Sequence, residues 1–283
     1  MWTAVVVTCP KQAWCQAVQE EVAAAMAQTG EAAELVLVVP DPGTTGGVGS
    51  GGASLNALLV LTEHLSARAG HTTIVPELLA EAKVLILHLG PATALPLPTG
   101  LAYVPSSTAS PLPSTSLARS LTIASLLARD AGPGVLVAST DILLTGALAP
   151  HPGPRLQGDL VLLTVPCSRP EYASRHGVAV LSSDSSVSTI LYQPRPEDLQ
   201  PEVSLLAGQV WLSPPVAESL LKLHSLPPVD SCTYMGADSG GPALAVSLYY
   251  DLLPATCSGV TKQDFVEGRW AEMFHEALPH QVR

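Results

Sequence analysis

Hydrophobic residues in the first half of the chain form short runs that alternate with longer amphipathic stretches. In Gln12–Thr29, for example, Trp14, Val18, Val22 and Met26 recur at helical spacing on one face. This strand–helix–strand order is typical of βαβ units, whose strands pair in parallel. We therefore predict an α/β fold with a mixed, largely parallel, Rossmann-like sheet and flanking helices. The expected strands are Thr3–Cys9, Glu34–Pro40, Thr72–Val75, Lys83–Gly90, Gly134–Thr140, Asp159–Pro166, Gly177–Ser183, Val187–Gln193 and Val203–Leu212. The expected helices are Gln12–Thr29, Ser54–Ala69, Ser116–Asp130, Pro214–Leu226 and the terminal Trp270–Arg283.

The stretch GGVGSGGASLNALL, Gly46–Leu59, is a cluster of glycines that runs into the helix expected from Ser54. Glycine lets another group approach the backbone closely. A G-x-G-x-x-G pattern is present, but it lacks the position after the first strand and the acidic residue of a dinucleotide site. Without a G-K-[ST] sequence it is not a Walker-type loop either. Two interpretations stay open: a phosphate cradle of backbone N–H groups, and a βα turn that binds nothing. The cradle residues would be Gly49, Ser50, Gly51 and Gly52.

Composition limits the partners of this chain. Hydrophobic residues make up 47% and charged residues 13%, which is typical of a folded domain. The formal net charge of −11 argues against nucleic acid and anionic membrane surfaces, because both are bound through lysine and arginine. There is no run long enough to span a membrane and no basic leader, so we expect a cytoplasmic protein. A nucleotide stays compatible, since backbone N–H groups and a metal ion can bind it.

Asp141 follows the expected strand Gly134–Thr140 and is the best candidate for a metal ligand. A carboxylate at the carboxyl end of a parallel strand faces the crevice in which α/β proteins bind ligands. Mg²⁺ is the ion that takes one or two such oxygens. A turn or a helix N-cap uses an aspartate equally well, so both interpretations stay open. Asp238 and Asp251 are weaker candidates of the same kind.

The segment ADSGGP, Ala237–Pro242, resembles the nucleophile segment of trypsin-like serine proteases, and His88, Asp141 and Ser239 follow the chain order of that family. The expected helices, however, do not fit into a pair of β-barrels. The five cysteines are scattered without the pairing expected of a secreted protease. A serine protease therefore stays the most remote alternative.

Further segments occur in an order expected of one family: VGSGGASLNALL, TEHLSARAG, KVLILHLG, VLVASTDILL, RHGVAVL, LLAGQVWLS, PPVDSCTYMGADSG and AVSLYYDLL. Together they resemble the N-terminal region of vertebrate L-fucokinase, which is related to GDP-fucose pyrophosphorylase. The resemblance covers Trp2–Arg269 and implies one pyrophosphorylase-like domain over 1–269 with a nucleotidyltransferase-like fold. The Pro-rich stretch 91–113 is then a loop of that domain, and 270–283 is a divergent tail.

The resemblance implies a role in fucose salvage, with GTP, ATP or GDP-fucose as the bound nucleotide. Full-length relatives add a GHMP-type kinase region with a P-x-x-x-G-L-[GS]-S-S loop, which these residues lack. We therefore expect a truncated family member that does not phosphorylate fucose alone and whose partner is that kinase region.

Active pyrophosphorylases also carry arginine and lysine after the strand that ends at His-x-Gly. The corresponding segment here, HLGPATALPLPTGLAYVP, has neither. Cations of this kind stabilise the charge that builds up during phosphoryl transfer. We therefore predict binding without any catalytic residue, and an active GDP-fucose pyrophosphorylase is the alternative.

Overall fold

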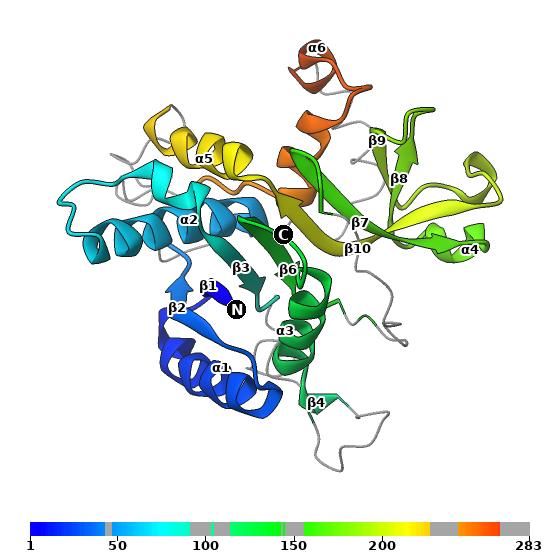
Figure 1. Cartoon of the computed structure of the whole chain (residues 1–283). Helices are drawn as coiled ribbons and strands as arrows, with labels where there is room; N and C mark the ends of the chain where they lie inside the picture. Colours follow the sequence, from blue (N-terminus) through cyan, green and yellow to red (C-terminus); the bar gives the residue numbers. More distant parts are fainter. Residues whose placement is uncertain are drawn as a thin grey trace. The chain divides into compact units, whose positions relative to one another are not determined.

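The computed structural model describes residues 1–42, 47–90, 103–104, 114–142, 144, 156–226 and 243–266. The chain divides into two compact units. The first comprises Met1–Val161 and Gln209–Val246, and the second comprises Leu162–Gly208 and Ser247–Arg283. The expected α/β fold, with a mixed sheet that is parallel at its core and flanked by helices, is confirmed (Figure 1).

Four parallel strands form the core of the first unit, in the order β2-β1-β3-β6. Three of them are almost entirely buried, and β2 lies at the edge. Their Val-, Leu- and Ile-rich sequences suit strands that are covered on both faces. Residues Gln209–Leu212 of β10 (Val203–Leu212) extend the sheet by pairing antiparallel with β6. The parallel strands are β1 (Trp2–Cys9), β2 (Ala33–Pro40), β3 (Lys83–His88) and β6 (Gly134–Ser139).

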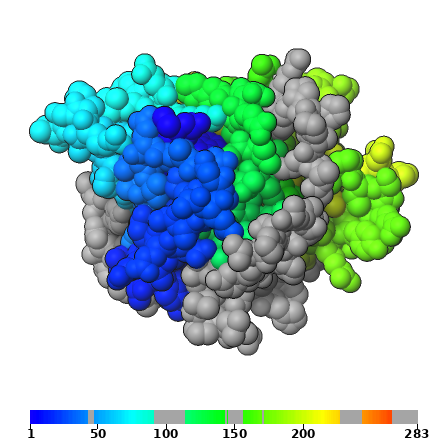
Figure 2. Space-filling model, turned by 60° about the horizontal axis from the view of Figure 1, so that its bottom comes forward, coloured from blue at the N-terminus to red at the C-terminus, as the bar shows by residue number. Residues whose placement is uncertain are grey.

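Helices cover both faces of this sheet. Helices α1 (Cys15–Thr29) and α3 (Ser116–Leu127) pack side by side on one face, where their surfaces adjoin in Figure 2. Helices α2 (Gly49–Arg68) and α5 (Pro214–Lys222) cover the other face (Figure 1). Leu87 belongs to the core beneath α1 and α3. Because side chains alternate along a strand, the neighbouring His88 faces α2.

The order of the strands creates a topological switch point. Strand β1 lies between β2 and β3, so the chain leaves β1 toward one side of the sheet and leaves β3 toward the other. Open α/β sheets bind ligands in the crevice outside the carboxyl ends of such strands. In this sheet the corresponding position is at the ends of β1 and β3, at Cys9 and His88.

The second unit is antiparallel. Strand β8 (Gly177–Leu181) pairs with β9 (Val187–Tyr192) and with the first part of β10, and β7 (Leu160–Cys167) also pairs with β10. The expected positions of these strands are confirmed to within two residues. Two short helices, α4 (Pro170–Ala173) and α6 (Lys262–Val266), and the π-helix Leu248–Leu252 belong to this unit.

Two expectations about local structure are wrong. Residues 72–75 were expected as a strand, but they lie outside any sheet and are mostly exposed. Pro76 begins a 3-10 helix (Pro76–Ala80) directly after them, and proline cannot donate to a strand ladder. The helix expected from Ser54 begins earlier, at Gly49, so the glycines form its first turn.

Some expected features lie outside the described residues. These are the terminal helix expected at 270–283 and most of the Pro-rich stretch 91–113. Within that stretch, Tyr103–Val104 forms β4, which pairs with β5 (Ser114–Thr115). None of the helices in the described segments is long and apolar enough to cross a membrane.

Candidate functional site

A row of polar residues crosses the carboxyl edge of the parallel strands. The strand register places Thr8 of β1 beside His88 of β3, and His88 beside Ser139 of β6. His88 is buried, with 8% of the residue exposed. Its Nδ1 lies 2.8 Å from Thr8 Oγ1, and its Nε2 lies 2.9 Å from Oγ of Ser54 in α2. The histidine therefore connects the switch point to α2, whose first turn contains the glycines.

Hydrogen-bond directions assign the tautomer of His88. Ser54 Oγ donates its single proton to the Ser50 carbonyl oxygen at 2.9 Å, so it accepts a hydrogen bond from His88 Nε2–H. Nδ1 is then unprotonated and accepts from the Thr8 hydroxyl. Burial lowers the pKa of His88 to about 4, and the charge of Asp141 opposes this shift. The ring is therefore neutral at physiological pH.

Asp141 lies at the same edge, just beyond the end of β6. Its carboxylate is exposed and accepts a hydrogen bond from Ser139 Oγ. Its charge acts on His88, which in turn bonds to Ser54 on α2. Asp141 and Ser54 of α2 are thus linked through His88 at the carboxyl edge of the sheet. The role of Asp141 as a ligand stays a prediction.

The acidic groups at this edge limit the metal site that they could form. Among the residues that the structure describes, no group of three or more His, Cys, Asp and Glu side chains is placed to hold a metal ion. Mg²⁺ commonly takes one or two carboxylates and completes its shell with phosphate oxygens and water. The exposed carboxylate of Asp141 is one oxygen donor of this kind, and the Mg²⁺ site stays a prediction.

The glycine stretch is covered by a later segment of the same chain. The N–H groups of Gly51 and Gly52 donate to the Val246 carbonyl oxygen at 2.8 and 3.0 Å, and Val246 N–H donates to the Val48 carbonyl oxygen at 2.8 Å. A Cβ atom on Gly49 would lie 2.4 Å from the same Val246 oxygen, and Gly49 has a φ of +73°. The close approach of Val246 therefore requires a glycine at position 49.

This contact bears on the expected phosphate cradle of Gly49, Ser50, Gly51 and Gly52. The first N–H groups of a helix need acceptors from outside the helix. The Val246 carbonyl already fills that role for two of the four residues. A phosphate would therefore bind nearer to the start of the turn or would displace this carbonyl. The cradle stays a prediction.

Asp41 is a candidate residue that the sequence pattern did not single out. It follows β2, and its N–H donates to the Cys9 carbonyl oxygen at 2.8 Å. Its Oδ2 lies 3.8 Å from the position of a Cβ on Gly47, beside the glycine turn. Burial raises the pKa of Asp41 to about 6, a property that clusters at functional sites. Its position directly after a strand, like that of Asp141, is the sequence feature that could have identified Asp41 as a candidate.

We expect Asp41→Asn to stabilise the protein at pH 8 and to have little effect at pH 4. The pKa of Asp41 is about 6 in the folded state and 3.8 for an ordinary aspartate, so stability falls as the pH rises from about 4 to 6 and the full cost is present at pH 8. Because the Asp41 side chain is partly exposed, the expected gain in the free energy of unfolding is about 1–2 kcal/mol. Urea unfolding at both pH values measures it. Glu34→Gln, at an exposed position of β2, controls for net charge, and an equal effect of both changes would contradict the prediction.

Two further polar atoms near this edge are buried without a partner. Thr140 Oγ1 and Gln209 Oε1 make no hydrogen bond to any residue in the described ranges. Gln209 pairs in register with Ala138 of β6, two residues before Thr140. Unpaired buried polar atoms are rare in folded proteins, which makes these two oxygens candidate contacts for a bound water or ligand. Neither residue stands out in the sequence.

Among the described residues, neither a protease relay nor a ligand role for Asp251 is formed at this site. Both ring nitrogens of His88 bond to Thr8 and Ser54, whereas a protease relay would use an aspartate and the nucleophilic serine. Ser239 and Asp238 lie outside the described residues. Asp251 accepts a hydrogen bond from the Ser247 N–H at 2.6 Å, which is a local turn contact.

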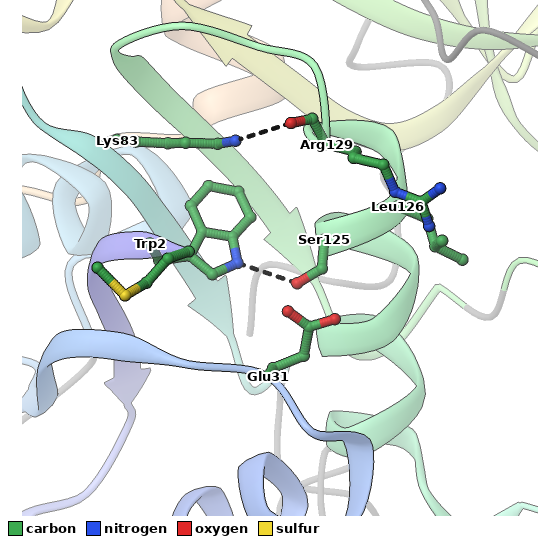
Figure 3. Close-up of a pocket in the computed structure, with 7 residues that line it drawn as sticks. Trp2, Glu31, Lys83, Ser125, Leu126 and Arg129 are labelled. Atoms are coloured by element: carbon green, nitrogen blue, oxygen red, sulfur yellow. Dashed lines mark hydrogen bonds between the residues drawn. The ribbon is translucent and has the colours of Figure 1, made fainter.

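A cavity of about 150 Å³ lies at the opposite, amino-terminal edge of β1 and β3 (Figure 3). Trp2 Nε1–H donates to Ser125 Oγ at 2.9 Å, and Lys83 Nζ donates to the Arg129 carbonyl oxygen at 3.4 Å. Lys83 Nζ also lies 5.4 Å from the centre of the Trp2 ring. Burial lowers the pKa of Lys83, and the charges of Asp130 and Glu31 oppose this shift. These contacts fasten two strands to the end of α3, so we interpret the cavity as structural.

Comparison with known proteins places the chain in a family. Residues 76–283 match the model of the fucose pyrophosphorylase domain, a range that includes His88 and Asp141 and begins after the glycine turn. No curated protein is significantly similar in sequence. The crystal structure of HddC from Yersinia pseudotuberculosis complexed with GMP-PN aligns with 97% of this chain and 100% of that chain, at 11% identity and a TM-score of 0.37. That likeness is too low to inform on ligand or activity. The family match covers well over half of the residues, and the chain therefore belongs to the fucose pyrophosphorylase domain family.

Proposed function

We propose that this chain binds a nucleotide or sugar nucleotide at the carboxyl edge of its parallel strands, as a fucokinase-related member of the family that acts in fucose salvage. The supporting observation is the convergence of Asp141, His88 and the first turns of α2 at the topological switch point. GTP, ATP and GDP-fucose are the candidate ligands. In relatives that carry a kinase region, the same domain would act as a regulatory partner of that region.

In this proposal the nucleotide phosphates lie near the start of α2, because the positive end of a helix favours an anion. Asp141 would hold Mg²⁺, which neutralises part of the phosphate charge when it is bound. His88 has a positioning role: it holds Thr8 and Ser54, and through them keeps β1 and β3 in place against α2. It transfers no proton, since both ring nitrogens are already engaged.

The proposed activity ends at binding. Between residues 43 and 117 the only lysine and arginine are Lys83 and Arg68. Lys11 follows β1 at the carboxyl edge, but its Nζ lies over the Trp14 ring, 4.8 Å from the ring centre. Lys83 lies at the opposite edge of the sheet, and Arg68 ends α2 and donates to the Glu34 carbonyl oxygen at 3.5 Å. Nucleotidyl transfer needs cations at the phosphate that is transferred. An active GDP-fucose pyrophosphorylase is the second candidate, favoured by the family match and by the additional carboxylate of Asp41.

Calorimetric titration with GTP, ATP and GDP-fucose, with and without Mg²⁺, tests this proposal. We expect Mg²⁺-dependent binding that weakens about tenfold or more in Asp141→Asn, because a contact to a charged group contributes about 1.5–3 kcal/mol. Asp130→Asn, an exposed carboxylate after α3, is the matched control and should bind as the parent does.

Pyrophosphate release with fucose 1-phosphate separates binding from catalysis. We expect no turnover. Turnover that disappears in Asp141→Asn would support the second candidate instead, and the absence of binding by all three nucleotides would overturn both.

A further inference from the structure

Cys9 and Cys15 flank the turn between β1 and α1, and their thiols converge on one backbone atom. Cys9 Sγ donates to the Lys11 carbonyl oxygen at 3.2 Å, and Cys15 Sγ donates to the same oxygen at 3.8 Å. Burial raises the pKa of Cys9, and the neighbouring Cys15 thiol raises it further. Both are free thiols in this structure. Two sulfur atoms are therefore held together at the carboxyl edge of the sheet.

The backbone of the turn maintains this arrangement. Cys9 is the last residue of β1, and its carbonyl oxygen accepts the Asp41 N–H. A single 3-10 turn, Gln12–Trp14, then leads into Cys15, the first residue of α1. Trp14 N–H donates to the Lys11 carbonyl oxygen at 3.0 Å, the same atom that receives both thiols. The turn thus carries Cys15 back over the end of β1.

We propose that Cys9 and Cys15 form a dithiol modification site, which a hydroperoxide converts into a reversible disulfide. Cys15 is partly exposed and Cys9 is fully buried, so the oxidant reaches Cys15 first. The Cys15 sulfur attacks a peroxide oxygen, the O–O bond breaks, and Cys15 becomes a sulfenic acid as one water leaves. The Cys9 sulfur then attacks the Cys15 sulfur, the S–O bond breaks, and a second water leaves with the Cys9 proton. One hydrogen peroxide is reduced to two waters while two thiols are oxidised to one disulfide.

The environments of the two thiols assign their order of reaction. Burial raises the pKa of Cys9 to about 12, so Cys9 is protonated at neutral pH and resists direct oxidation. Its reactivity comes from its position beside the Cys15 sulfur, since proximity replaces a bimolecular encounter. Cys257 provides the contrast: it is buried, its Sγ donates to the Leu253 carbonyl oxygen, and no second thiol contacts it within the described residues.

This inference is independent of the proposed nucleotide site, although the two lie at one edge. Thr8, which bonds to His88, directly precedes Cys9, and Asp41 bonds to the Cys9 carbonyl. A disulfide would therefore alter the backbone next to His88 and Asp41. Its formation is nevertheless measured without any nucleotide, so it can succeed or fail separately.

Trypsin provides a direct test, because it cleaves after Lys11, between the two cysteines. The full chain is treated with hydrogen peroxide, its remaining thiols are alkylated, and the digest is analysed by mass spectrometry. We expect peptides 1–11 and 12–68 to appear joined, two hydrogens lighter than their summed mass, and to separate after reduction. Cys15→Ser should abolish the joined species, whereas Cys257→Ser should leave its yield unchanged.

The variant Cys9→Ser tests the order of the two steps. In Cys9→Ser the Cys15 sulfenic acid has no resolving thiol, so it should accumulate and react with dimedone. Circular dichroism confirms that each variant is folded. Oxidation of Cys15 to sulfinic acid while Cys9 stays open to alkylation, or a joined species that persists in Cys15→Ser, would overturn the proposal.

Discussion

Replacing Gly49 with alanine is expected to destabilise the protein by about 3 kcal/mol or more. Part of this loss comes from the φ of +73°, which is unfavourable for a residue with a Cβ atom. The larger part comes from the new Cβ, which would lie 2.4 Å from the Val246 carbonyl oxygen. That oxygen would have to move away from the N–H groups of Gly51 and Gly52, which would leave them without their acceptor.

Two other glycines provide matched controls for this experiment. Gly47 and Gly70 have similar φ values of +68° and +84°, but a Cβ on Gly47 would meet nothing closer than 3.8 Å and one on Gly70 would meet nothing within 4 Å. Alanine at either position should cost about 1–2 kcal/mol, the backbone penalty alone. Urea unfolding of the three variants isolates the contribution of the Val246 contact. Equal losses at all three positions would show that the contact is unimportant.

The same variants separate the two interpretations of the glycine stretch. If close contact with Val246 is its main role, Gly49→Ala lowers stability whether or not a nucleotide is present. If the turn serves chiefly as a phosphate cradle, the variant keeps its stability and loses affinity for nucleotide. The geometry of Gly49 leads us to expect the first result.

The second large effect is expected from His88→Phe, which should cost about 2–4 kcal/mol at pH 7. Phenylalanine preserves most of the ring volume but bonds to neither Thr8 nor Ser54, and it leaves the buried Thr8 hydroxyl without its acceptor. His64→Phe, at an exposed position of α2, is the control and should change stability little. A loss of equal size in the control would contradict the role of the hydrogen-bonded network.

The difference in the free energy of unfolding between the parent and His88→Phe should also depend on pH. His88 has a pKa of about 4 in the folded state, whereas the ordinary pKa of histidine is 6.5, so between these pH values the unfolded state binds the extra proton. The stability that His88 contributes is therefore complete above about pH 6.5 and falls by about 3 kcal/mol as the pH drops to 4.

Asp41 has the opposite pH dependence, because its raised pKa favours folding at low pH. It is present in both proteins, so its contribution cancels in the difference between them. Unfolding of the parent and of His88→Phe at pH 7 and pH 4 measures how much their stability difference changes. NMR titration of the His88 ring then shows whether its pKa accounts for that change. A His88 ring that titrates near pH 6.5 would contradict the buried, neutral state.

Much of the architecture was predictable because it depends on local pattern. The strand expected at Val203–Leu212 is found with the same bounds, and α1 ends where Gly30 adopts a left-handed φ of +70°. Residues 72–75 show the limit of such reasoning. Their β-branched sequence suits a strand, but strand formation also needs a partner with free backbone groups, and no local pattern reports one.

The candidate site was only partly predictable. Asp141 could be placed at the carboxyl edge because the end of a parallel strand has a defined position in the fold. Asp41 and the bonds of His88 could not be predicted, because they depend on burial and on contacts between distant segments. Desolvation sets the pKa values of both residues, and it is a property of the packed structure alone.

By itself the sequence determined the class of fold, since hydrophobic periodicity and element order select a βαβ sheet. It also indicated that another group can approach the backbone closely near Gly49, because glycine has no Cβ atom, but it left open which group does so. Only the tertiary structure decided that this group is the Val246 carbonyl and that His88 lies neutral between Thr8 and Ser54. The physical reason is the same in both cases: the partners are far apart along the chain, and only packing brings them within hydrogen-bond distance and excludes water from between them.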